Sequence, residues 1–174
     1  SQDLGDFVAR PNVKTGGREI VAIPTPDGFS EYQASLAERI DAIRKRSGKP
    51  EKGDDIILSV IGDGRFSAID MRFVDPTLPS DPNSKLNTVI RDMAEAYHAT
   101  ADNEYVTDGA VDDLNGGALM MFTDIGLGEQ SAASRGFDMK QWITDELIRL
   151  GVKREDIAFM RDNKTHAKKG KLFD

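Results

Sequence analysis

Residues 118–130 read ALMMFTDIGLGEQ, an apolar run that ends in Thr123, Asp124 and a glycine-containing loop. A short apolar run bounded by turn signals is typical of a buried strand. Polar side chains after such a strand have two interpretations. They mark a plain transition from strand to loop, or they face a ligand, because open α/β sheets bind ligands outside the carboxyl ends of their strands.

The chain after this strand alternates between helical and strand-like patterns. Residues 137–151 carry the apolar face of a helix, with Gly151 at the position that follows a helix C-cap. A short strand is expected from Ile157 to Met160, and a further helix is expected to begin within residues 164–174. Strand, helix, strand and helix in this order predict a parallel sheet with right-handed crossovers.

Two helices are predicted in the part of the chain that precedes residue 118. Residues 84–100 repeat apolar side chains at helical spacing, and Ser84 is suited to cap the amino end. Residues 29–47 also read as a helix, in which Ser30 and Gln33 have the spacing of a capping box. The apolar stripe of this helix consists of Tyr32, Leu36, Ile40 and Ile43.

The remaining segments are short. A strand is expected within residues 18–26, where proline ends a β-branched run. The apolar run from Ile56 to Ile61 also reads as a strand that glycines break, and a short helix follows it up to Pro76. The proline-containing segment 77–83 reads as a linker and is the best internal boundary.

The composition is that of a soluble globular protein and excludes several classes of function. The net charge of -7 argues against a generally basic nucleic-acid binder, although an acidic body can carry a local basic patch. The chain has no cysteine, so disulfides, thiolate chemistry and zinc sites built on cysteine are excluded, and a cytoplasmic location is expected. No apolar run approaches the roughly 18 residues of a membrane span.

Motifs for catalysis, cofactors and metals are missing from the sequence. It contains no Walker A motif, no complete dinucleotide-binding fingerprint and no serine in a nucleophile elbow. His98 and His166 lie far apart, and the acidic loop 101–117 lacks the carboxylate spacing of an EF-hand. We therefore expect no catalytic residue, no bound cofactor and no metal site in this chain.

Two basic clusters remain as candidates for phosphate contacts. The first lies at the end of the helix 29–47, where the helix dipole already accounts for cations. The second lies near the start of the last predicted helix, where cations oppose the dipole and a bound phosphate would gain from both the lysines and the backbone N–H groups. Its members are Lys164, Lys168, Lys169 and Lys171.

Several short motifs occur in an order that is similar to a known family. The segment DMRFVDP is followed by a proline-containing linker, then by SKL at 84–86, MMFTDIG at 120–126 and EDIAFMRDNKTHAKKGKLFD at 155–174. This order resembles the Swi/Snf-type helicase-like translocases of superfamily two. It is most similar to phage- and plasmid-type proteins that join such a helicase module to an adenine-specific DNA methylase.

The resemblance implies an α/β fold in which a helical segment precedes a partial RecA-like helicase lobe with a short parallel sheet. Residues 1–76 would be the end of the first lobe, 77–83 the linker, and 84–174 the first half of the second lobe. The motifs that hold ATP and Mg²⁺ would lie outside this chain, so we expect a fragment of a longer protein. Nucleic-acid contacts would come from Thr123, Asn163, Lys164, Thr165 and Lys168.

The implied function is that of a part of a DNA-dependent ATPase or translocase that contacts DNA and is not catalytically complete by itself. The expected partners are DNA and the remaining lobes of the same polypeptide, with no membrane. Because a half lobe leaves a sheet edge unpaired, we expect the helical part or a second copy to cover the strand 119–122 or 157–160. The alternative is a non-catalytic protein-interaction domain derived from a half helicase lobe.

Overall fold

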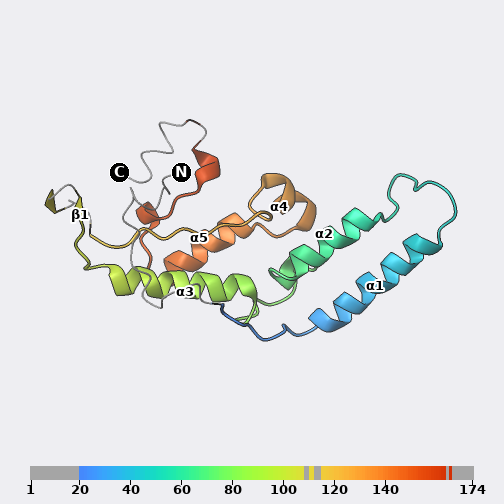
Figure 1. Cartoon of the computed structure of the whole chain (residues 1–174), viewed down its shortest axis with the longest axis horizontal. Coiled ribbons are helices and arrows are strands. Elements are labelled where there is room, and N and C mark those ends of the chain that lie inside the picture. The colour runs from blue at the N-terminus through green and yellow to red at the C-terminus, as the bar shows by residue number, and fades with distance from the viewer. Residues whose placement is uncertain (1–19, 108–109, 112–114, 164, 166–174) are drawn as a thin grey trace, which may run out of the picture.

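The computed structural model describes residues 20–107, 110–111, 115–163 and 165, and this part of the chain is mostly helical (Figure 1). Its α-helices are α1 (Phe29–Lys45), α2 (Ile57–Ser67), α3 (Lys85–Thr100), α4 (Glu129–Arg135) and α5 (Met139–Arg149). Short 3-10 helices are η2 (Met71–Phe73), η3 (Arg154–Asp156) and η4 (Met160–Asp162). The strands β1 (Val106–Thr107) and β2 (Ala110–Val111) pair with each other in antiparallel orientation.

The expected α/β fold, a partial RecA-like lobe with a short parallel sheet, is wrong for the described residues. No parallel pair of strands forms among them, and the two-stranded hairpin of β1 and β2 is the sheet that they contain. Three of the predicted strands are irregular or too short: 20–26 is irregular, 118–123 has no strand partner, and 157–159 lies between η3 and η4, which begins at Met160. Strands satisfy their backbone by pairing, so an apolar run without a neighbour does not become one.

Three of the predicted helices are present in the structure. Those for 29–47, 84–100 and 137–151 are confirmed by α1, α3 and α5. Ser84 accepts a hydrogen bond from the backbone N–H of Asn87 at 3.2 Å, as a cap should, and Gly151 has a φ of 90°. The capping box at Ser30 is wrong, because Gly28 occupies the N-cap of α1 and no side chain caps that end.

Helices α1 and α2 form a hairpin that extends away from the other helices (Figure 1). The predicted strand from Ile56 to Ile61 is wrong, because this run begins α2. The glycines after it lie inside the helix instead of breaking it. Gly64 lets α1 approach, since a Cβ at this position would lie 3.2 Å from Leu36 Cδ1. Leu36 and Val60 are the buried apolar side chains of this hairpin.

Ion pairs supplement the small apolar contact of the hairpin. The guanidinium of Arg39 lies 2.7 Å from Asp55 Oδ1 and 2.8 Å from Asp63 Oδ2. Asp63 also forms an ion pair with Arg135 of α4, in which Oδ1 of Asp63 lies 2.6 Å from Nη2 of Arg135. This ion pair joins the hairpin to the rest of the chain. The hydrogen bonds from Arg39 hold the pKa of Asp55 below its ordinary value.

Replacing Asp55 with asparagine is expected to lower the melting temperature at neutral pH. Because the pKa of Asp55 is lower in the folded than in the unfolded chain, its stabilising contribution is complete above the unfolded pKa of about 3.9. The contribution is lost as the pH falls through the folded-state pKa. Thermal melts followed by circular dichroism should therefore show a difference between parent and Asp55→Asn that disappears in acid.

Asp41→Asn provides the matched control, because Asp41 also lies in the hairpin but pairs with Arg44 at 3.8 Å and not with Arg39. Its melting temperature should follow that of the parent at every pH. A difference between parent and Asp55→Asn that stays constant into acid would show that the charge of Asp55 contributes nothing.

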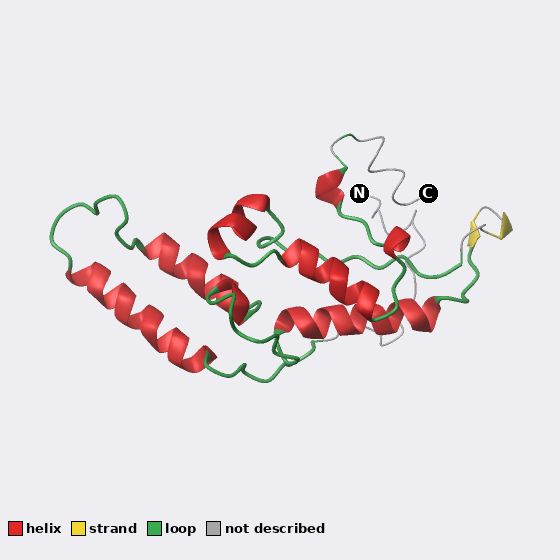
Figure 2. Ribbon diagram, turned by 180° about the vertical axis from the view of Figure 1, so that it is seen from behind, coloured by secondary structure: helices red, strands yellow, loops and turns green. Residues whose placement is uncertain are grey.

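The main core lies between α3 and α5, which run side by side (Figure 2). Phe73 of η2 packs edge-on against Phe137, with ring centroids 5.0 Å apart. Ile157, in a segment that was predicted as a strand, is also buried there. The buried members of this cluster are Phe73, Leu86, Ile90, Ala94, Phe137, Met139, Ile143, Leu147, Val152 and Ile157.

The segment 118–122 lies at the surface of this core. Met121 packs against the buried cluster, whereas the side chains of Met120 and Phe122 are 64% and 86% exposed. The helical part therefore covers this segment only on the side of Met121, whereas Ile157 of the segment 157–160 is buried; cover by a second copy stays a prediction.

Candidate nucleic-acid interface

A groove of about 270 Å³ lies where α2, the start of α3 and the segment after residue 122 meet. It brings together two cations, Arg65 and Lys85, with the hydroxyl-bearing Thr123. The remaining lining residues are Ala68, Ile69, Asp124 and Ile125. Of the residues that the sequence predicts to contact nucleic acid, Thr123 lines this groove together with the basic side chains of Arg65 and Lys85.

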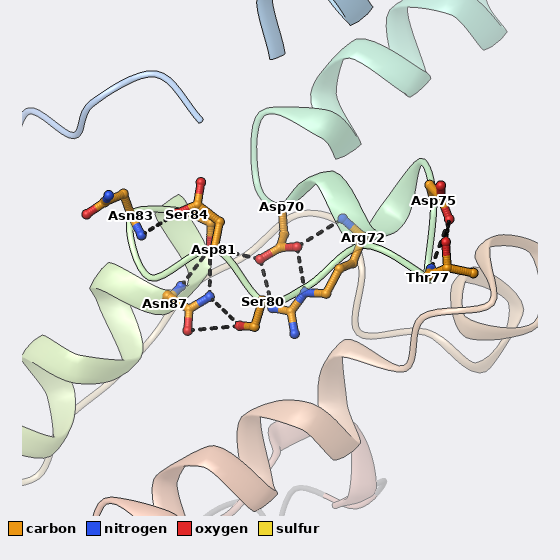
Figure 3. A network of polar contacts seen from close by, with 9 residues as sticks. All are labelled: Asp70, Arg72, Asp75, Thr77, Ser80, Asp81, Asn83, Ser84 and Asn87. Carbon is orange, nitrogen blue, oxygen red and sulfur yellow. Dashed lines mark hydrogen bonds and ion pairs between the residues drawn. The ribbon is translucent and has the colours of Figure 1, made fainter. Parts of the chain in front are cut away.

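The residue before Lys85, Ser84, belongs to a buried polar network (Figure 3). Ser84 donates from Oγ to Asp70 Oδ2 at 2.8 Å. Asp70 also accepts two hydrogen bonds from the guanidinium of Arg72, each 2.8 Å long. Both side chains of the ion pair are almost fully buried. The amino end of α3, and with it the backbone of Lys85, is therefore fixed to the turn around η2.

Aromatic rings hold the cationic member of this network. The guanidinium carbon of Arg72 lies 4.5 Å from the centroid of Phe137 and 4.4 Å from that of Trp142. A cation against an aromatic face is stabilised by the ring quadrupole. The polar network is thus built into the core that α5 provides.

Asp124 forms an ion pair with Arg65. Its carboxylate lies 3.6 Å from the guanidinium of Arg65, and its side chain is 91% exposed. A surface ion pair of this kind contributes little to stability, but it restricts where the Arg65 side chain points. Thr123 donates from Oγ1 to the carbonyl oxygen of Ile125 at 2.7 Å, so its hydroxyl is also held in place.

The other predicted contact residues do not join this groove. Asn163 follows η4 and donates from Nδ2 to the carbonyl oxygen of Phe159 at 3.2 Å. Thr165 is exposed, and it does not line the groove. Lys164 and Lys168 lie outside the described residues.

Sequence reasoning missed Arg65 and Lys85 as contact residues. Arg65 stands alone in a segment that was read as a strand followed by a short helix, so it had no basic neighbours to draw attention. Lys85 belongs to the SKL motif, which gave a signal for the start of a helix but not for a ligand.

A second hollow, of about 350 Å³, lies beside α5 and carries charges of both signs. Its Lys140 pairs with Asp162 at 2.7 Å and lies over the ring of Phe159. Glu129 and Asp138 add negative charge, and Arg154 adds a cation. This balance gives the hollow no clear preference for a phosphate.

No protein-family model, curated protein or solved structure matches this chain. Within the described ranges, no group of three or more histidine, aspartate or glutamate side chains is placed to hold a metal ion. None of the helices in the described part of the chain is both long and apolar enough to cross a bilayer.

Proposed function

We propose that this chain is a DNA-contacting part of a helicase-like translocase that is linked to an adenine-specific DNA methylase. The observation that carries the proposal is the groove in which Arg65, Lys85 and Thr123 meet. The resemblance described above adds support, since its SKL motif and its MMFTDIG motif contribute Lys85 and Thr123 to this groove. The proposal also places the protein in the cytoplasm.

The chemistry of the groove suits a phosphate of the nucleic-acid backbone. Arginine and lysine side chains are common donors to phosphate oxygens, and they position a protein on DNA without reading its sequence. Thr123 would donate to the phosphate in place of its present acceptor, the carbonyl oxygen of Ile125. The amino end of α3 lies at Lys85 and adds the positive end of a 16-residue helix dipole. A bound phosphate would compete with Asp124 for Arg65, so Asp124 should weaken DNA binding.

In this proposal the chain supplies contacts and not ATP hydrolysis. Motor ATPases assemble phosphate-binding groups, a metal and a water-positioning residue around the nucleotide, and the sequence has no Walker A motif. Robust hydrolysis of ATP by this chain alone would contradict the proposal.

Replacing Lys85 or Arg65 with alanine is expected to weaken binding to a short DNA duplex. Each lost phosphate contact should reduce the slope of log affinity against log salt by about 0.9, since one counterion fewer is released. Fluorescence anisotropy over a series of salt concentrations measures both quantities. Asp124→Asn should have the opposite effect on affinity, because it frees Arg65 for the phosphate.

Arg44→Ala is the matched control for these variants. Arg44 is a cation on α1 whose side chain is 71% exposed, and it does not line the groove. Arg44→Ala changes the net charge by the same amount as Lys85→Ala or Arg65→Ala. Equal effects of Arg44→Ala and Lys85→Ala would show that binding follows the overall charge and that the groove is not the site.

A protein-interaction domain is the second candidate function, and the exposure of the segment 118–122 favours it. Phe122 presents 86% of its surface to solvent, and large apolar side chains in an exposed cluster often mark an interface. An apolar interface would depend little on salt, whereas phosphate contacts weaken steeply with it. The salt series therefore separates the two functions.

A further inference from the structure

Side-chain burial alternates as in a strand from Met120 to Asp124, and Ala118 and Leu119 before them are both exposed. Met121 and Thr123 are partly buried, and Met121 packs against the core. Met120, Phe122 and Asp124 are exposed between and beside them. Successive side chains of a strand point to opposite faces, so one face of this segment is already packed and the other is open.

The backbone of this segment has no partner within the described residues. None of its N–H or C=O groups from 118 to 124 takes part in a backbone–backbone hydrogen bond there. The strands β1 and β2 pair with each other and not with this segment. Exposed backbone groups along an extended segment form a template for another strand, because each strand edge presents a row of donors and acceptors.

We propose that the segment 118–122 pairs in antiparallel orientation with the same segment of a second copy of this chain. The twofold axis would pass through Met120, so that each copy contributes an identical edge to a closed, isologous contact. The packed face of each segment stays on its own helices, and the open faces combine into one apolar surface.

The sequence of the segment is self-complementary in this register. Phe122 of one copy faces Ala118 of the other, so the largest exposed side chain meets the smallest. The pairing ends before Gly117, because Gly116 has a φ of 96° and the N–H of Gly117 donates to Thr100 Oγ1. No like charges meet. In a parallel, in-register pair, the two Asp124 carboxylates would be neighbours, and like charges at such positions are destabilising.

The exposed face of α2 is a weaker candidate for self-association and supplies the control. Leu58 is 74% exposed, and Ile57 and Ile61 are about half exposed beside it. The backbone of α2, however, is hydrogen-bonded within the helix. This face therefore offers no free backbone groups that would pair with a strand or fix the register of a partner.

The chain contains no cysteine, so a single introduced thiol reports on the contact. Met120→Cys would place two thiols directly opposite each other, with Cβ atoms about 4.5–5.5 Å apart, close to the separation of about 3.5–4.5 Å in disulfides. Leu58→Cys is at least as accessible, since Leu58 is 74% and Met120 64% exposed, but it lies outside the contact. The amount of disulfide-linked dimer on non-reducing gels is measured over time under mild oxidation, without DNA.

Met120→Cys is expected to cross-link at least about tenfold faster than Leu58→Cys, since pairing raises the local thiol concentration to the millimolar range. A mixture of Ala118→Cys and Phe122→Cys should cross-link faster than either variant alone, which tests the register. Equal rates for Met120→Cys and Leu58→Cys would overturn the proposal. So would a parent chain that sediments as a monomer at every concentration tested. Neither result bears on DNA binding, which the salt series tests separately.

Discussion

Replacing Arg72 with methionine is expected to lower the free energy of unfolding by about 3–5 kcal/mol, the usual cost of breaking a buried ion pair. Methionine keeps much of the packing volume between Phe137 and Trp142. It removes both guanidinium hydrogen bonds to Asp70, whose side chain is 2% exposed. A buried carboxylate then lacks its countercharge. Urea denaturation followed by circular dichroism measures the change.

The double variant Asp70→Asn, Arg72→Met is the control that identifies the cause. It removes both charges, so it should be more stable than Arg72→Met although it carries one more substitution. Ser84 can still bond to the amide at position 70. A double variant less stable than Arg72→Met would show that the loss comes from packing between the rings and not from the unpaired charge.

Gly126→Ala is expected to cost about 2–4 kcal/mol, as the sum of backbone strain and overpacking. Gly126 has a φ of 98°, a conformation that side chains disfavour. A Cβ there would lie 2.7 Å from Met139 Cε and 3.0 Å from Phe73 Cζ, and both of these residues belong to the buried core. Thermal or urea denaturation of the purified variant measures the loss.

Two other glycines separate these contributions. Gly48 has a φ of 96° with nothing within 4 Å of a built Cβ, so Gly48→Ala should show the strain alone. Gly62 lies inside α2 with open space around it, and Gly62→Ala should stabilise the protein by about 0.5–1 kcal/mol. If Gly126→Ala cost no more than Gly48→Ala, the contact with Met139 and Phe73 would not be tight.

Helices with a regular apolar stripe could be predicted from the sequence, whereas the fold class could not. The spacing in 84–100 indicates a helix because local hydrogen bonds and one packed face are enough to form it. The run from Ile56 to Ile61 is short and uniformly apolar, and such a run does not distinguish a buried helix from a strand. A strand at 118–122 also needs a neighbour, which depends on distant parts of the chain.

The candidate interface could be predicted only in part, for the same reason. Thr123 followed from its position after an apolar run. Arg65 and Lys85 come from two other elements, and they reach Thr123 because the Asp70 network fixes the turn between α2 and α3. No local pattern encodes a contact between three separate segments.

The ion pairs of the α1–α2 hairpin have a consequence for the dynamics of the molecule. The hairpin buries few apolar side chains of its own, and its charged contacts are screened by salt. It should therefore open as a unit of lower stability than the helices α3 and α5. In hydrogen–deuterium exchange, amides of α1 should exchange before those of α3, and added salt should widen the gap between the two rates.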